Sequence, residues 1–201
     1  MTTSATAQPV PTVPTHDPPA LRQLRWAWPL AILVGFPIGG LLADLVVDGV
    51  ASVGSAVAGG LIAGAVTGAA EWLVLRRWVS WLWIAATTIG MAAGLTAGAA
   101  LIDYGIGRAD LALMGAVTGA GVGGLQALVL ARHRFPGAFW WAVANPPAWA
   151  LGWLATSYVI SRNVKDQFTN FGASGALVFA ILTGVLLAWL FRRMERGARA
   201  T

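Results

Sequence analysis

The sequence predicts an all-α membrane protein with six transmembrane helices, arranged as three tandem parallel helical-hairpin repeats. Three observations carry this prediction. Hydrophobic residues make up 57% of the 201 residues and charged residues only 10%, whereas a soluble domain has about 25% charged residues. Six apolar segments are long enough to cross a bilayer. Tryptophan, small residues and arginine recur along these segments at matching spacings.

The apolar segments divide the chain into three parts. Residues 1–20 are rich in Pro and Thr and are expected to form a disordered cytoplasmic tail. Residues 21–193 form the predicted six-helix transmembrane domain, and residues 194–201 form a short basic cytoplasmic tail.

Each apolar segment has about 20 residues or more, the length that a helix needs to cross a hydrocarbon core. Helices are expected because every backbone polar group must be satisfied within lipid. The segments do not alternate in polarity, which argues against a β-barrel. They are residues 26–47, 51–75, 79–102, 110–130, 138–160 and 172–191.

Basic residues predict the orientation of the helices. With six spans, one side holds Arg108, Arg162 and Lys165, and the other side holds all the remaining basic residues. The side rich in arginine is expected to be cytoplasmic, so both termini are cytoplasmic. The arginines that set this topology include Arg76, Arg77, Arg132, Arg134, Arg192 and Arg193. The Ala-, Gly-, Arg- and Trp-rich composition further indicates a bacterial cytoplasmic (inner) membrane.

The first, third and fifth segments share a pattern that begins at a tryptophan. Small residues follow the tryptophan after seven and eleven positions, which returns them to nearly the same helix face. The tryptophans are Trp28, Trp83 and Trp141, and the small residues are Gly35 and Gly39, Gly90 and Gly94, and Ala148 and Gly152.

The second, fourth and sixth segments share a stripe of small residues that ends nine positions before an arginine. The stripes are Gly60, Gly64 and Gly68, then Gly115, Gly119 and Gly123, then Ala176, Ala180 and Gly184. The unit is a hairpin of roughly 50–60 residues, repeated three times. The alternative is chance recurrence in a chain rich in glycine and alanine.

Small residues let helix backbones approach closely in lipid, so these stripes predict helix packing. Packing within one six-helix bundle is the first interpretation. Contacts with a second copy of the chain are the alternative.

Three polar residues within the apolar segments form a candidate intramembrane site. Glu71 lies on the Gly60 and Gly64 face, and the corresponding residue of the second repeat is Gln126. Asn145 precedes two prolines that are expected to interrupt the fifth helix. The interruption is a kink for packing in one interpretation, and in the other Asn145 and freed carbonyls line a polar cavity. The site binds a proton or cation in one interpretation. In the other, the Glu71 carboxyl accepts hydrogen bonds from Gln126 or Trp indoles, or reaches water.

Chemistry beyond this site has little support in the sequence. The chain has no Cys, its two His lack metal-ligand spacing, and no catalytic or phosphate-binding motif occurs. We therefore predict no catalytic residues, no metal and no cofactor. Nucleic acid is excluded as a partner because the basic residues lie at the ends of apolar segments.

The segments 68–77 (GAAEWLVLRR) and 123–132 (GGLQALVLAR) share one pattern. It is a Gly-rich helix that ends in Gln/Glu-Trp-Leu-Val-Leu-Arg, followed by a Trp-led helix with a small-residue stripe. The pattern resembles small uncharacterised multi-pass membrane proteins of cyanobacteria, chloroflexi and actinobacteria, over about residues 28–193. The second copy has Ala127 in place of the Trp, and the third lacks the Gln/Glu. The resemblance implies no activity.

These features predict a non-enzymatic membrane protein with a scaffold, assembly or sensing role. A small transporter or channel for a proton, cation or small solute is the alternative. The expected partners are the lipid bilayer and either a second copy or another membrane protein. A water-filled cavity at Glu71 favours transport, whereas a tightly packed bundle favours the scaffold.

Overall fold

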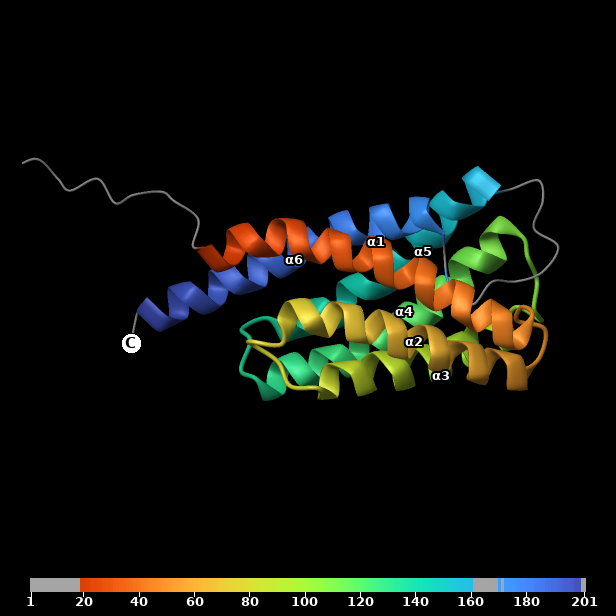
Figure 1. The fold of residues 1–201 in the computed structure, drawn as a ribbon, viewed down its shortest axis with the longest axis horizontal. Helices are drawn as coiled ribbons and strands as arrows, with labels where there is room; N and C mark the ends of the chain where they lie inside the picture. Colours follow the sequence, from red (N-terminus) through yellow and green to blue (C-terminus); the bar gives the residue numbers. More distant parts are fainter. Residues whose placement is uncertain (1–18, 161–169, 171, 200–201) are drawn as a thin grey trace, which may run out of the picture.

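The computed structural model describes residues 19–160, 170 and 172–199, and over these residues the chain is all-helical. Residues 1–18 of the predicted tail, and most of the connection between the fifth and sixth predicted segments, therefore lie outside the described residues. The last two residues of the predicted tail, 19 and 20, belong to the first helix. The six helices are shown in Figure 1. They are α1 (Pro19–Val47), α2 (Val53–Leu75), α3 (Leu82–Leu101), α4 (Arg108–Arg132), α5 (Ala138–Ile160) and α6 (Ala173–Arg199).

Five of these helices, α1 to α4 and α6, are long and apolar enough to cross a membrane. The predictions of an all-α fold and of a multi-pass membrane protein are thereby confirmed. The remaining helix, α5, has 23 residues but carries Asn145, two prolines and four tryptophans, which lower its hydropathy.

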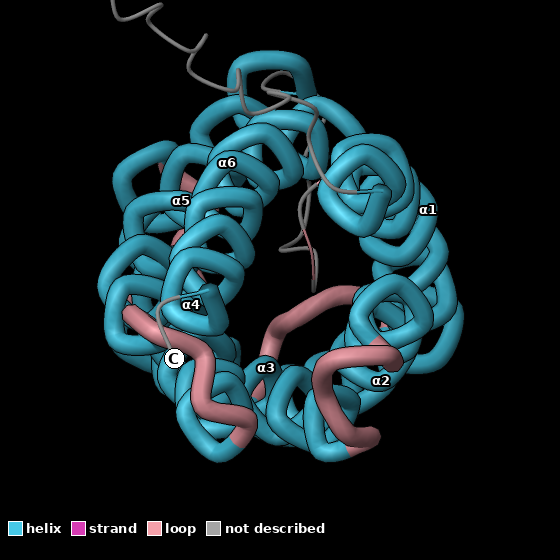
Figure 2. The backbone as a smooth tube through the Cα atoms, turned by 90° about the vertical axis from the view of Figure 1, so that its left-hand side faces the viewer, coloured by secondary structure: helices cyan, strands magenta, loops and turns pink. Residues whose placement is uncertain are grey.

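The helices form a closed ring in chain order. Each helix packs against the helices before and after it, and α6 packs back against α1. No other pair of the described helices has backbones in close approach. The view along the helices shows this ring (Figure 2).

Consecutive helices run in opposite directions, so the connections alternate between the two ends of the ring (Figure 1). One end holds the start of α1, the α2–α3 and α4–α5 connections and the end of α6. Arg76 and Arg77 directly follow α2, Arg132 ends α4, and Arg134 lies in the α4–α5 connection. All four therefore lie at this same end, which we call the arginine end.

Two helix boundaries differ from the expected ones. The helix α6 continues to Arg199, so residues 194–199 extend the last helix and are not a separate segment. The helix α5 is not interrupted at Asn145, because it runs through Pro146 and Pro147 to Ile160.

The α1–α2 connection turns at Asp48 and Gly49, whose φ values are 50° and 92°. Positive φ values are left-handed backbone conformations, which Asp tolerates and Gly adopts freely.

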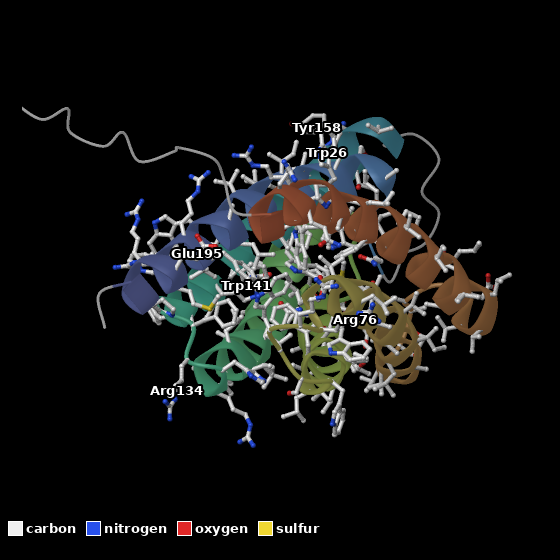
Figure 3. The ribbon with its side chains drawn as sticks, turned by 60° about the vertical axis from the view of Figure 1, so that its left-hand side comes forward. Trp26, Arg76, Arg134, Trp141, Tyr158 and Glu195 are labelled. Carbon is white, nitrogen blue, oxygen red and sulfur yellow. The ribbon has the colours of Figure 1, made fainter. Side chains whose placement is uncertain are left out.

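Aromatic side chains pack inside the ring. Trp28, Trp83 and Trp141 are all fully buried, and the Trp141 ring lies 5.9 Å from that of Trp28 and 5.8 Å from that of Trp83. These rings belong to α1, α3 and α5, whose backbones do not approach one another closely. The side chains therefore meet across the inside of the ring, and Trp141 lies among the helices in Figure 3. A second group, Phe36 and Phe179 with Trp149, meets at ring distances of 5.3–5.7 Å.

Candidate functional site

Glu71 lies at the centre of a buried polar cluster near the arginine end. The residue precedes Arg76 by five positions, which places it about 7.5 Å along the helix axis from that arginine. It is 2% exposed. Its Oε2 atom accepts hydrogen bonds from Trp83 Nε1 and Gln126 Nε2, both at 2.9 Å. These two donors come from α3 and α4, so the carboxyl joins three helices.

Gln126 extends the cluster to α5. Its Nε2 group donates to Glu71 and also to Thr87 Oγ1 at 2.8 Å. Its Oε1 atom accepts from Trp141 Nε1 at 2.8 Å. An indole N–H only donates, so this bond fixes which end of the amide faces Trp141.

Thr87 completes the cluster. Its hydroxyl lies 3.0 Å from the Trp83 carbonyl oxygen and 3.4 Å from Glu71 Oε2. One hydroxyl proton serves only one acceptor at a time, and the shorter distance favours the carbonyl. The hydroxyl then accepts from Gln126. The sequence interpretation missed Thr87, although it lies one helical turn after Trp83.

The tryptophan of α1 makes a comparable bond to a different kind of residue. Trp28 Nε1 donates to Thr183 Oγ1 of α6 at 3.0 Å, and both side chains are buried. The residue that corresponds to Glu71 and Gln126 by spacing is Leu187, and Thr183 lies one turn before it. In each of the three cases the tryptophan of an odd-numbered helix donates to an even-numbered helix beside it in the ring.

Asn145 is fully buried but does not bond directly to Glu71 or Gln126. Its Nδ2 group donates to the Trp141 carbonyl oxygen of its own helix at 2.8 Å. Its Oδ1 atom has no hydrogen-bond partner among the described residues. Trp141 therefore lies between Asn145 and the cluster. The structure brings Glu71 and Gln126 into direct contact, whereas Asn145 is connected to them only through Trp141.

The predicted packing glycines lie where neighbouring helices approach closely, against backbone or side-chain atoms of the next helix. A Cβ atom at Gly60 would lie 2.6 Å from Ala92 Cα, and one at Gly90 would lie 2.7 Å from Val122 Cα. Real Cβ atoms essentially never approach within 3.0 Å. The other predicted glycines with such contacts under 3.0 Å are Gly35, Gly39, Gly64, Gly68, Gly94, Gly115, Gly119 and Gly123.

Gly152 lies in the interface between α5 and α6. Its carbonyl oxygen occupies the space that a Cβ at Gly175 of α6 would need. The sequence interpretation missed Gly175, and it also missed Gly98 and Gly121. Gly98 continues the Gly90 and Gly94 stripe by one more turn, so the spacing could have identified it. Gly175 belongs to no glycine stripe and carried no such signal.

The arginines expected to set the topology are exposed at the arginine end. They are Arg76, Arg77, Arg132, Arg134, Arg192 and Arg193. Arg134 projects away from the helices (Figure 3). The guanidinium carbon of Arg193 lies 4.7 Å from the centroid of a Trp189 ring, a cation–π contact. At this end His133 Nε2 also accepts from the Ser80 backbone N–H at 3.1 Å, which ties two connections together.

The described residues include no group of three or more His, Cys, Asp or Glu side chains that could hold a metal ion. Three surface grooves lie between α1 and α2, between α1 and α6, and between α3 and α4. None of these three grooves is lined by Glu71, Gln126 or Asn145. The cluster is thus a set of side chains that bond to one another inside the ring.

Comparison with known proteins finds no family model, no curated protein and no solved structure that matches the chain.

Proposed function

We propose that the chain is a non-enzymatic scaffold, assembly or sensing protein of the bacterial cytoplasmic membrane. The observation that carries this proposal is the packing of aromatic side chains inside the ring. Trp28, Trp83 and Trp141 meet inside the ring, and the rings of Phe36, Phe179 and Trp149 form a second aromatic group. Large rigid side chains at this position oppose a continuous aqueous path.

The polar cluster supports the same proposal. The described donors to the Glu71 carboxyl are the uncharged side chains of Trp83 and Gln126. Buried polar groups that satisfy one another specify one arrangement of helices. The cluster joins α2, α3, α4 and α5, which suits a structural role.

The proposal includes six spans, with α5 as the sixth, and three tandem parallel hairpins. The closed ring supports a sixth span, because α5 packs against α4 and α6 along the bundle. The three tryptophan hydrogen bonds support the repeat, since Trp28, Trp83 and Trp141 each donate to an even-numbered neighbour. The arginine end is the cytoplasmic end in this proposal, and both termini are cytoplasmic.

The proposed partners are lipid and either a second copy or another membrane protein. Apolar side chains face outward on every helix of the ring, for example Leu73 on α2 and Leu128 on α4, which are 57% and 66% exposed. Such positions suit photo-crosslinking residues. A discrete crosslinked band in native membranes is expected at some of these positions, and its mass distinguishes a second copy from another protein.

Transport of a proton, cation or small solute is the second candidate. It is favoured by buried side-chain oxygens without hydrogen-bond partners among the described residues. They are Asp44 Oδ1, Thr67 Oγ1, Asn145 Oδ1 and Thr156 Oγ1. Such atoms carry a desolvation cost that a passing ion or water molecule would relieve.

One experiment separates the two candidates. The purified chain is reconstituted into liposomes that contain a pH-sensitive dye, and proton entry is measured under an imposed pH gradient and potential. Light scattering after an osmotic step with glycerol reports small solutes in the same vesicles. The scaffold proposal predicts the rates of protein-free liposomes. Proton entry above that level, lost in a folded Glu71→Gln variant, contradicts the scaffold and establishes the transporter.

A further inference from the structure

Two of the surface grooves occupy equivalent places in the first two hairpins, one between α1 and α2 and the other between α3 and α4. Each is lined by a leucine, a valine and an arginine of its second helix. These residues are Leu73, Val74 and Arg77 in the α1–α2 groove, and Leu128, Val129 and Arg132 in the α3–α4 groove. Counterparts lie 55 positions apart, the spacing that also separates Trp28 from Trp83. The proposed repeat therefore places the same groove in both hairpins.

The corresponding place in the third hairpin is occupied by a side chain of the chain itself. Trp189 lies four positions before Arg193, where the first two hairpins have Leu73 and Leu128. The Trp189 ring lies over the start of α5, because a Cβ at Gly137 would lie 3.2 Å from Trp189 Cζ3. The guanidinium carbon of Arg193 lies 4.7 Å from the centroid of the same indole. In this hairpin an apolar group beside the arginine thus comes from the protein.

The arginines of the first two hairpins have no such neighbour. The guanidinium groups of Arg77 and Arg132 make no ion pair, side-chain hydrogen bond or ring contact within the part of the chain that the structure describes. No carboxylate is among the described residues that line either groove. Both arginines are exposed at the arginine end. Each groove therefore offers an apolar surface with a positive charge where the helices leave the bilayer.

The dimensions of the grooves fit the upper part of a lipid. Leu73 and Arg77 are four residues apart, so helix geometry separates them by about 6 Å along α2. The groove volumes are about 170 and 260 Å³, and a cavity of about 150 Å³ holds one benzene ring. Each groove therefore has room for the first few carbons of an acyl chain. Guanidinium groups bind phosphate oxygens through paired hydrogen bonds, so the phosphate of such a lipid fits beside the arginine.

We propose that each of these two grooves binds one anionic phospholipid, with its phosphate at Arg77 or Arg132 and an acyl chain against the apolar wall. The α1–α2 groove is the stronger site, because Arg76 and the Gln23 amide also line it. Arg132 is the one arginine among the described residues that line the α3–α4 groove. The two lipids take the place in the first two hairpins that Trp189 takes in the third.

The test is a native mass spectrometry titration of the full chain in a neutral detergent, with phosphatidylglycerol and phosphatidylcholine as separate probes. We expect two phosphatidylglycerol molecules per chain and a clear preference over phosphatidylcholine. Arg77→Gln and Arg132→Gln should each weaken one of the two binding steps about five-fold, since one arginine near an anionic surface contributes about that factor. The matched controls are Arg134→Gln and Arg196→Gln, which remove the same charge from exposed residues outside both grooves.

A second pair of variants fills the grooves without changing their charge. Leu73→Trp and Leu128→Trp copy the Trp189 arrangement, and both leucines are exposed, so the larger ring leaves the packed interior undisturbed. Each variant should weaken the same binding step as the arginine variant of its groove. The control is Leu45→Trp, which adds the same ring at an exposed position near the other end of α1. Thermal unfolding verifies that every variant is folded.

Four results would overturn the proposal. They are equal binding of the two lipids, equal loss in the groove and control arginine variants, unchanged binding in both groove tryptophan variants, and competition by inorganic phosphate as strong as that by the lipid. The inference rests on the lipid contact proposed above. Its failure leaves the scaffold proposal standing, because the liposome flux measurement decides that proposal separately.

Discussion

Gly123 and Gly124 are adjacent in α4, but alanine at the two positions has very different neighbours. A Cβ at Gly123 would lie 2.8 Å from Asn145 Cγ and closer still to Asn145 Cβ. A Cβ at Gly124 would have nothing within 4 Å. Asn145 is fully buried and bonds to the Trp141 carbonyl oxygen, so it cannot simply move aside. We predict that Gly123→Ala destabilises the protein relative to Gly124→Ala.

The magnitude follows from the contact distances. Carbon atoms attract best at separations of about 3.5–4.0 Å, so a methyl group at Gly123 forces α4 and α5 apart. Overpacking of this kind costs about 1–3 kcal/mol. The intrinsic gain of alanine over glycine in a helix, about 1 kcal/mol, applies to both variants and cancels in their difference. For a chain of this size the expected difference in Tm is about 2–12 °C.

The assay is thermal unfolding in mild detergent, followed by intrinsic fluorescence of the 11 tryptophans. Unfolding in increasing SDS provides a second measure of relative stability. Equal Tm values for the Gly123 and Gly124 variants would refute the reasoning, because the close approach of α4 and α5 would then have no energetic consequence.

Three further predictions concern the cluster, the ring closure and the topology. Glu71→Leu removes an acceptor from two buried donors and should cost about 1–3 kcal/mol for each, whereas Glu71→Gln keeps an acceptor and should unfold near the parent Tm. Trp28→Phe and Thr183→Val should each cost about 1 kcal/mol, and the double variant should cost less than their sum; strict additivity would mean that the hydrogen bond contributes nothing. The chain has no Cys, so single cysteine variants report the topology. Gln23→Cys should react with an impermeant thiol reagent only from the cytoplasm, and Ala51→Cys should react only from outside. The opposite labelling pattern would contradict the proposed topology.

The sequence predicts the helices well because the bilayer imposes a simple requirement on them. Long apolar segments must become helices, and glycine and arginine mark their connections. The spacing that relates Glu71 to Gln126 also predicts more than secondary structure. It places two residues 55 positions apart in equivalent places on neighbouring hairpins, and their side chains lie 2.9 Å apart.

Other features depend on three-dimensional packing that spacing alone does not encode. Thr183 accepts from Trp28 although the corresponding residue by spacing is Leu187, one turn away. The helix α5 continues through Pro146, whereas a proline was expected to interrupt it. Lost backbone hydrogen bonds are tolerated where neighbouring helices pack closely, and Gly119 and Gly123 of α4 lie against Asn145 at this point.

The accessibility of position 87 to water tests most directly whether side chains fill the interior of the ring. Thr87 is fully buried beside Glu71, and cysteine is similar to threonine in size. In native membranes, Thr87→Cys is predicted to stay unmodified by a small water-soluble thiol reagent under conditions that fully label Ala51→Cys. Thermal unfolding of the same sample verifies that the variant is folded. Rapid labelling of a folded Thr87→Cys variant from either side would reveal water at the cluster and contradict the filled ring.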